Sequence, residues 1–230
     1  MYNLRLFTST EFHMSAALDL DAFRATPLQH EPFDYLIVPR FVRGEALERI
    51  NGDYPAIGER GSFPVNRVSY GPAFKSLLDE LESEEFRAAF EQKFGLDLSG
   101  RPTTTTVRGR CGKGDGQIHT DSKSKIITVL IYMNSAWEKP GGRLRLLRSG
   151  DNLNDFIAEV PPVEGTLVAF KRANNSWHGH EPFEGERRVI QFNWVTSEGN
   201  RHTAMLRHHV SASIKKLFAA VRPRAHQPVS

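Results

Sequence analysis

The sequence predicts a mainly β fold with flanking helices, built around a double-stranded β-helix core of the jelly-roll or cupin-like kind. Two observations predict it. From residue 103 onward, short runs of β-branched and aromatic residues are separated by Gly, Pro, Asn and Asp turns. Before residue 103, apolar residues recur at the spacing of helices. Many short strands in series are typical of closed or double-sheet β architectures, and the jelly roll is the kind that can hold a metal in its mouth.

The strands of this core are expected within residues 103–196. Their ranges are 103–108, 126–133, 143–147, 156–160, 166–170 and 188–195. Residues 1–102 are expected to supply an N-terminal strand and supporting helices, and residues 201–222 a C-terminal basic amphipathic helix. No repeat or low-complexity linker divides the chain, so the sequence predicts a single domain over residues 1–230.

The supporting elements follow from local patterns. A strand is expected over residues 33–38 and a short helix over 45–50. Apolar side chains fall at i, i+3, i+4 and i+7 within residues 74–81, which predicts a helix with one apolar face. Ser83 is suited to begin a second helix and Gly95 to end it.

The composition is that of an ordinary globular protein. The chain has 230 residues, of which 39% are hydrophobic and 25% are charged. No apolar run is long enough to span a membrane, and the N-terminus lacks the pattern of a secretory signal. The one cysteine, Cys111, cannot form an internal disulfide, which favours a reducing, cytoplasmic setting. Met14 leaves open that translation starts later than numbered.

Basic residues are concentrated at the C-terminus. Residues 201–230 hold six Lys and Arg residues and no acidic residue. Such a segment can bind an anionic substrate, nucleic acid or a membrane surface, or it can be the solvated face of a surface helix. The surface helix is the favoured interpretation, and a nucleic-acid partner is not expected.

His119, Asp121 and His178 form the most informative pattern in the chain. Two imidazoles and one carboxylate, with other coordination positions open, are the ligand set of non-haem Fe(II) oxygenases. In an extended segment, His119 and Asp121 would leave the same face and could reach one ion. The third ligand must come from a distant strand. His180 shares a face with His178 in an extended segment and competes with it for this role.

The ordered series resembles the 2-oxoglutarate- and Fe(II)-dependent dioxygenase superfamily, and its prolyl-4-hydroxylase-like branch in particular. The likeness runs over about residues 108–195. It includes a Tyr-Met-Asn segment at 132–134, a Gly-Gly turn at 141–142 and a Gly-x-Leu-x-x-Phe segment at 165–170. Family spacing places a Pro four residues after the distal ligand, which matches Pro182 to His178. His180 is then a neighbour that contacts the co-substrate or the metal-bound ligand.

The resemblance implies a hydroxylase that binds Fe(II) through His119, Asp121 and His178. It also implies 2-oxoglutarate and O2 as co-substrates, with succinate and CO2 as products, and it leaves a need for ascorbate open. Halogenating relatives replace the carboxylate ligand, so Asp121 implies hydroxylation. The substrate is not identified; a small molecule and a protein side chain are both compatible. The oligomeric state is also open.

The resemblance further implies an arginine that holds the 2-oxoglutarate carboxylate, as a guanidinium can do bidentately. Arg188 follows His178 by ten residues and would share a face with Ile190, Phe192 and Trp194. This apolar stripe is expected to face inward, which favours Arg188 over the adjacent Arg187. Tyr132 is a candidate to bond the same carboxylate, or else a core tyrosine.

Several cations are expected near the mouth of the barrel. They are Lys123, Lys125, Arg143, Arg145 and Arg148. If they ring the metal, they would favour an anionic substrate through steering and direct pairing. As an alternative, they are strand-edge charges that discourage association between sheets.

Three other functions are compatible with these residues. A metal-dependent cupin-type isomerase or epimerase would use a similar barrel without the carboxylate-binding arginine. A 2-oxoglutarate-consuming sensor would keep every site residue and lack a productive substrate. A non-catalytic binding module on the same fold would tolerate loss of the triad. Succinate production that depends on iron and 2-oxoglutarate discriminates among them.

Overall fold

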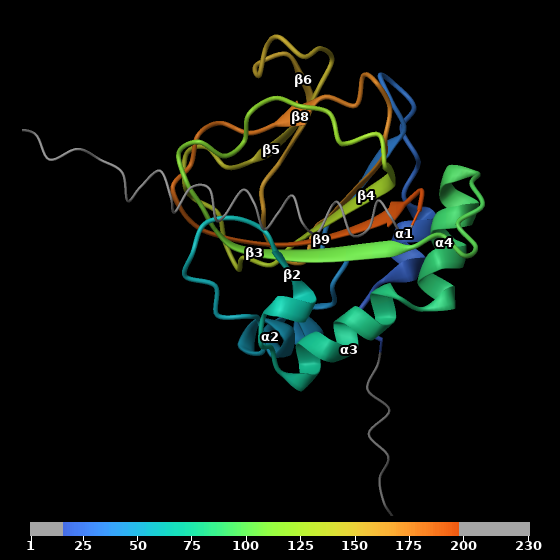
Figure 1. Cartoon of the computed structure of the whole chain (residues 1–230), viewed down its shortest axis with the longest axis vertical. Helices are drawn as coiled ribbons and strands as arrows, with labels where there is room; N and C mark the ends of the chain where they lie inside the picture. Colours follow the sequence, from blue (N-terminus) through green and yellow to red (C-terminus); the bar gives the residue numbers. More distant parts are fainter. Residues whose placement is uncertain (1–15, 198–230) are drawn as a thin grey trace, which may run out of the picture.

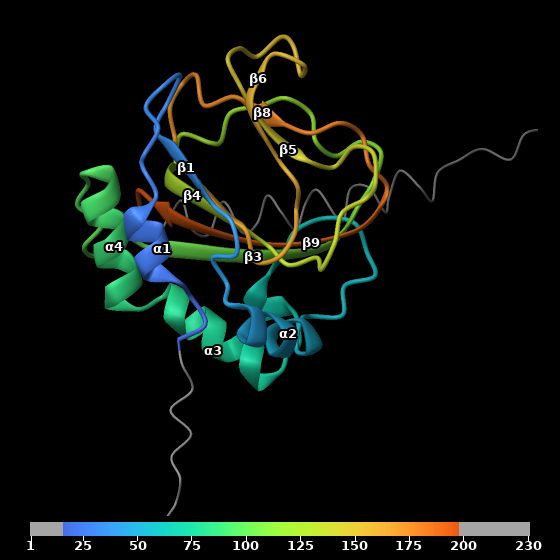
Figure 2. The ribbon, with the colours of Figure 1, turned by 180° about the vertical axis from the view of Figure 1, so that it is seen from behind.

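Two antiparallel sheets dominate the computed structural model, which describes residues 16–197. The larger sheet has the strand order β1-β7-β4-β9-β3-β2, and the smaller sheet has the order β6-β5-β8. Figures 1 and 2 show the smaller sheet over one face of the larger sheet and helices under its other face. The predicted β fold with flanking helices is therefore confirmed. Met14 and the helix expected over 201–222 lie outside the described residues.

The predicted strands of the core are all present. The strands of the larger sheet are β1 (Tyr35–Val38), β2 (Phe63–Pro64), β3 (Thr103–Cys111), β4 (Lys125–Tyr132), β7 (Leu167–Lys171) and β9 (Gly185–Val195). Those of the smaller sheet are β5 (Leu144–Leu147), β6 (Phe156–Val160) and β8 (His178–Gly179). The sequence did not predict β2 and β8, because two residues are too few to show a period of two.

Helices cover the outer face of the larger sheet. They are α1 (Leu20–Ala25), α2 (Gly44–Gly52), α3 (Pro72–Leu81) and α4 (Glu84–Phe94), with a 3-10 turn, η1 (Val65–Arg67), after β2. Every residue of the predicted apolar face of α3 is buried. The six-residue helix α1 was not predicted, and it buries one side chain, Phe23.

The start and end of α4 are built as the sequence predicts. The Ser83 hydroxyl accepts a hydrogen bond from the Phe86 amide at 3.1 Å, and Gly95 ends the helix in the left-handed conformation with φ 62°. Replacing Ser83 by Ala should lower the free energy of unfolding by about 1 kcal/mol, because one amide loses its acceptor. Urea denaturation would measure this. Ser76→Ala, within α3, is the matched control and should leave stability nearly unchanged, so an equal loss in both variants would contradict the capping role.

The outer core lies between the helices and β9. The Trp194 ring lies 5.8 Å from the Phe86 ring and 4.9 Å from the Phe90 ring, measured between centroids. Ile190 and Phe192 are buried in the same cluster. This contact between β9 and α4 fixes which face of the strand turns toward the helices and which turns toward the smaller sheet.

The inner face of the larger sheet is partly polar. A second apolar cluster, which includes Tyr132, Leu144 and Phe170, joins this face to the smaller sheet. Beside it lies a group of neighbouring polar side chains on β3, β4 and β9, which we call the polar floor. It consists of Thr104, Thr106, Thr128, Gln191 and Asn193. A polar surface inside a β fold needs hydrogen-bond partners. The partners of the polar floor belong to the functional site.

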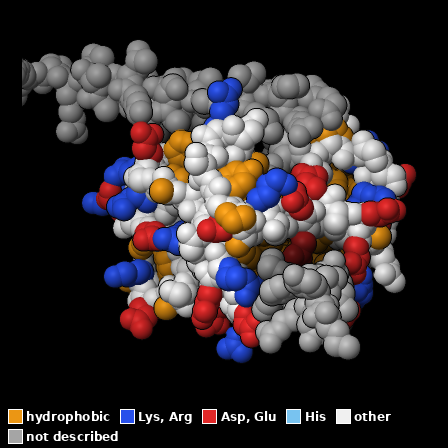
Figure 3. Space-filling model, turned by 90° about the horizontal axis from the view of Figure 1, so that it is seen from below, with side chains coloured by type: hydrophobic (Ala, Val, Ile, Leu, Met, Phe, Trp, Pro, Cys, Tyr) orange, Lys and Arg blue, Asp and Glu red, His pale blue; other side chains and the backbone are white. Residues whose placement is uncertain are grey.

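The helix side of the molecule carries charges of both signs. Figure 3 shows Lys and Arg side chains interspersed with Asp and Glu over the described part of this face. None of the helices within residues 16–197 has the length and apolar character needed to cross a membrane.

Candidate metal and co-substrate site

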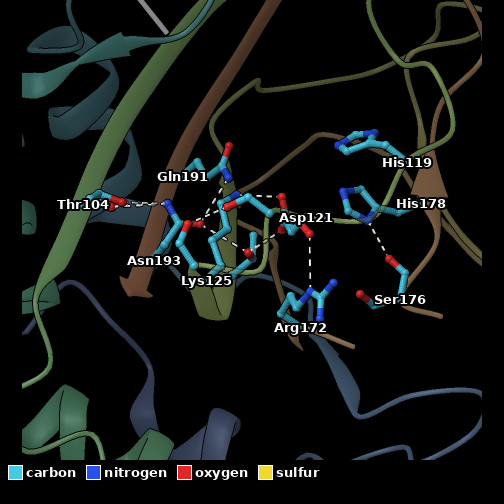
Figure 4. Close-up of polar contacts among 12 residues, drawn as sticks. Thr104, His119, Asp121, Lys125, Arg172, Ser176, His178, Gln191 and Asn193 are labelled. Atoms are coloured by element: carbon cyan, nitrogen blue, oxygen red, sulfur yellow. Dashed lines mark hydrogen bonds and ion pairs between the residues drawn. The ribbon is translucent and has the colours of Figure 1, made fainter. Parts of the chain in front are cut away.

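Backbone pairing brings the two predicted histidine ligands together. His119, in the loop before β4, forms an isolated antiparallel bridge with His178 on β8. Each amide donates to the carbonyl of the other residue at 3.0 Å, and the ring centroids lie 4.3 Å apart. Asp121 completes a group whose potential ligand atoms all lie within 4.8 Å of one another. Figure 4 shows the three side chains converging. The structure therefore brings together the three residues that the sequence singled out.

Both imidazoles are held in one tautomer. His119 Nδ1 lies 2.8 Å from the Gln117 carbonyl oxygen, and His178 Nδ1 lies 3.0 Å from the Ser176 carbonyl oxygen. Because a carbonyl oxygen can only accept, each Nδ1 carries the proton and each Nε2 keeps a free lone pair. Burial lowers the pKa of His178 to about 4, which keeps this imidazole neutral at pH 7. The rings are thus prepared to bind a cation through Nε2.

Asp121 is held by two side chains of β4. Lys125 Nζ donates to one carboxylate oxygen at 2.7 Å, and the Thr128 hydroxyl donates to the other at 2.5 Å. Burial by itself would raise the pKa of Asp121, but the Lys125 ammonium, with the Thr128 hydrogen bond, holds it well below its usual range. The carboxylate is therefore ionised and fixed, as a metal ligand requires.

The polar floor extends this support across three strands. Asn193 on β9 places its Oδ1 3.2 Å from the Thr128 hydroxyl, and its Nδ2 donates to the Thr104 hydroxyl at 3.1 Å (Figure 4). Gln191 Nε2 donates to the same Asn193 oxygen at 3.2 Å. The sequence did not identify these supporting residues, because their contacts join strands far apart in the chain. The alternation of polar residues along β3 and β9 was the available signal.

A cavity of about 290 Å³ runs from the three potential ligands to Arg187 and Tyr132. The Arg187 side chain is 5% exposed, and its guanidinium lies 5.2 Å from the centre of the Tyr132 ring. Arg187 Nε donates to the Gly142 carbonyl at 2.7 Å. The Tyr132 hydroxyl is buried and has no hydrogen-bond partner among residues 16–197. Leu144 lines the cavity as an apolar wall.

The expectation that Arg188 faces this cavity is wrong. Arg188 lies on the opposite face of β9, where it donates to Glu186 at 2.7 Å and its guanidinium lies 5.5 Å from the centre of the Tyr54 ring. The physical reason is that its neighbours Ile190 and Phe192 pack on the outer core, not inside the barrel. Arg187 therefore takes the inward position.

His180 lies in the same cavity but outside the potential metal group. It is 7% exposed, and its Nδ1 donates to the Glu181 carbonyl at 2.8 Å. Burial, together with the nearby Arg187 guanidinium, lowers the pKa of His180 to about 4. A neutral imidazole next to Arg187 fits the predicted role of a neighbour to a bound ligand.

Only one of the predicted mouth cations lines the cavity among the described residues, namely Lys125. Arg145 pairs with Glu159 at 2.6 Å and Arg148 with Asp155 at 2.8 Å. Of the two interpretations of these cations, the ring around the metal is therefore wrong, because Glu159 on β6 pairs with Arg145 and Asp155, just before β6, pairs with Arg148. The other arginines of the cavity lining are Arg60, Arg108 and Arg187.

Comparison with known proteins places this site in a family. Residues 107–196, which span the three potential ligands and Arg187, match the 2OG-Fe(II) oxygenase superfamily. This match covers 90 of the 230 residues, and over them the chain is similar to that superfamily. No curated protein matches the chain in sequence. The superfamily uses Fe(II), 2-oxoglutarate and O2, and the protein is a 2-oxoglutarate-dependent oxygenase of unidentified substrate.

Solved structures agree with the fold of this 2OG-Fe(II) oxygenase. One is a prolyl hydroxylase from Trichoplax adhaerens in complex with a hypoxia inducible factor peptide, with TM-score 0.55 and 17% identity over 80% of this chain and 91% of that chain. Another is the viral collagen prolyl hydroxylase of Paramecium Bursaria Chlorella virus-1 in complex with 2OG, with TM-score 0.50 and 14% identity over 70% and 96% of the two chains. These likenesses show the fold, and the prolyl-4-hydroxylase-like branch stays a prediction.

Proposed function

We propose that His119 Nε2, His178 Nε2 and one Asp121 oxygen bind Fe(II), and that Arg187 and Tyr132 bind the distal carboxylate of 2-oxoglutarate. The observation that carries the proposal is the buried Arg187 guanidinium. It has no acidic partner among the described residues and lies at the far end of the cavity from the potential ligands. A buried cation is costly unless an anion pairs with it. A dicarboxylate that reaches from the metal to Arg187 supplies that anion.

The residues of the cavity fit both Fe(II) and 2-oxoglutarate. Two neutral imidazoles and one carboxylate suit Fe(II) and leave coordination positions open. At the other end, the buried Tyr132 hydroxyl without a partner can donate to a carboxylate, as can the Arg187 Nη groups. The assignment of Arg187 replaces that of Arg188.

The iron supplies the oxidative chemistry, in which one oxygen atom of O2 enters succinate and the other replaces a substrate C–H bond with C–OH, while CO2 leaves. The residues of the protein orient the metal ligands and cover the site. The carbonyls of Gln117 and Ser176 orient the imidazoles, and Lys125 and Thr128 orient Asp121. Phe170, whose ring lies 4.8 Å from the His178 ring, covers one side of the site with an apolar surface.

We also retain two broader parts of the proposal. The free, buried Cys111 supports a reducing, cytoplasmic compartment. The whole chain is proposed to act as one domain, in which residues 1–102 support the catalytic core at 103–196.

Succinate formation tests the proposed function. The purified protein should form succinate from 2-oxoglutarate only with Fe(II) and O2, even slowly without added substrate. His119→Ala should abolish it, while Lys139→Ala, at an exposed position away from the site, should not. Succinate formation that continues without Fe(II) would contradict the proposal, and its absence in the wild type would favour a binding module or an isomerase.

Replacing Lys125 by Met should weaken the binding of Mn(II), used in place of Fe(II), by about tenfold or more, because substitutions behind a metal ligand typically cost 10–100-fold in affinity. The reason is that the Lys125 ammonium, 2.7 Å from Asp121, holds this carboxylate ionised and in place. Calorimetric titration would measure the change. Lys123→Met removes an exposed charge from the same loop and should leave the affinity unchanged. Equal effects of the two substitutions would show that Lys125 acts only through general charge.

A further inference from the structure

Two cations flank the proposed iron ligand Asp121. Lys125 Nζ lies 2.7 Å from its carboxylate, and the Lys125 side chain is 12% exposed. Arg172, directly after β7, donates from Nε to the Asp121 main-chain oxygen at 3.4 Å. Figure 4 shows Arg172 and Lys125 on two sides of Asp121. Asp121 thus has one cation at its carboxylate and another at its main-chain oxygen.

Arg172 has no carboxylate partner among residues 16–197. The adjacent Lys171 differs, because its ammonium lies 3.9 Å from an Asp34 oxygen. Arg172 is half-buried, so its guanidinium has lost part of its hydration without gaining an opposite charge. Such a group is available to an external anion.

The charge balance at the loaded site remains positive. The Asp121 carboxylate and the metal-binding carboxylate of 2-oxoglutarate together offset the charge of Fe(II), and the distal carboxylate is offset by Arg187. The imidazole ligands are neutral. Lys125 and Arg172 therefore leave about two uncompensated positive charges beside the reacting atoms. A neutral substrate would leave them unpaired, whereas an anionic substrate would pair with them.

The cavity presents polar groups besides the potential ligands, and in the proposed function 2-oxoglutarate fills part of its volume of about 290 Å³. The polar floor presents Gln191 and the hydroxyl of Thr106 toward it, and this hydroxyl is buried without a hydrogen-bond partner among the described residues. A buried hydroxyl of this kind needs a polar ligand group.

We propose that the substrate is a small organic anion, whose carboxylate or phosphate group is bound by Arg172 and Lys125 beside the iron. The inference rests on the proposed function, since it uses the proposed positions of iron and 2-oxoglutarate. Guanidinium and ammonium groups bind such anions through charge-assisted hydrogen bonds. Lys125 lines the cavity beside Asp121, and Arg172 contacts Asp121 from its main-chain side.

Matched pairs of charged and neutral probes test this proposal. The protein loaded with Mn(II) and 2-oxoglutarate is titrated with N-acetylglycine and its neutral amide, and with glycerol 3-phosphate and glycerol. We expect the charged member of at least one pair to bind about tenfold or more tightly than its neutral partner. The pair that shows the larger preference distinguishes a carboxylate from a phosphate. Arg172→Ala should remove most of the preference, Arg172→Lys should keep part of it, and Lys171→Ala should keep all of it.

Two results would overturn the proposal. One is the absence of any charged preference in the wild type, and the other is a preference that Arg172→Ala leaves intact, as direct binding of anions to the metal would. The affinity for Mn(II) and the melting temperature of each variant show whether its site is folded, and Arg172→Lys serves as the informative variant if Arg172→Ala is unfolded. Failure of the wild type to bind Mn(II) or 2-oxoglutarate would instead contradict the proposed function.

Discussion

Replacing His178 by Ala should abolish succinate formation and weaken the binding of Mn(II) by more than ~100-fold. Substitutions behind a metal ligand typically cost 10–100-fold in affinity, and the loss of one of three protein ligands should cost more. The effect is amplified here because His178 is buried and its Nε2 is directed by the Ser176 carbonyl. Calorimetric titration with Mn(II) and an assay for succinate would measure the two effects separately.

His180→Ala is the matched control for this prediction. The two histidines are two residues apart and similarly buried, and only His178 belongs to the group of potential ligands. The control variant should therefore bind one Mn(II) per chain, as the wild type does, with at most a change in the affinity for 2-oxoglutarate. Normal metal binding by His178→Ala, with loss in His180→Ala, would reverse the ligand assignment.

Replacing Arg187 by Ala should raise the KM for 2-oxoglutarate by about tenfold or more. A hydrogen bond to a charged group contributes roughly 1.5–3 kcal/mol, and about 1.4 kcal/mol corresponds to a factor of ten in affinity. Arg187 is buried, lines the cavity and lies beside Tyr132.

Arg188→Ala provides the neighbouring control. Its guanidinium pairs with Glu186 near the surface, where removal of an ion pair has little effect. We expect its KM for 2-oxoglutarate to stay within about twofold of the wild type. Steady-state kinetics of both variants at saturating Fe(II) would rank them. A larger KM in Arg188→Ala than in Arg187→Ala would show that the carboxylate binds on the other face of β9.

The metal group could be predicted from the sequence, whereas the face of β9 could not. His119 and Asp121 are two residues apart, and the spacing to His178 follows a family pattern, so no tertiary information was needed to propose them. For β9 the apolar stripe was taken as inward. In this fold both faces of β9 are buried, one against α4 and one in the cavity, and the apolar face is the one against the helices. Hydrophobicity alone therefore could not assign Arg187 and Arg188.

The residues that support the ligands also depend on tertiary structure. β8 is only two residues long and shows no period, yet its pairing with His119 places both imidazoles. The sequence indicated that Lys125 is a positive charge near the metal. Its contact with Asp121 could not be predicted, because it depends on where β4 begins. Hydrogen bonds connect Asn193 to both Thr128 and Thr104. These three residues are 24 to 89 positions apart in the chain and lie on three strands, so no local sequence pattern predicts their contacts.

A crystal structure with Mn(II) and 2-oxoglutarate would test the central claim most directly. The account predicts the metal on His119 Nε2, His178 Nε2 and one oxygen of Asp121, with the distal carboxylate of 2-oxoglutarate within hydrogen-bond distance of Arg187 and Tyr132. A metal bound through His180 in place of His178, or a carboxylate bound away from Arg187, would contradict it.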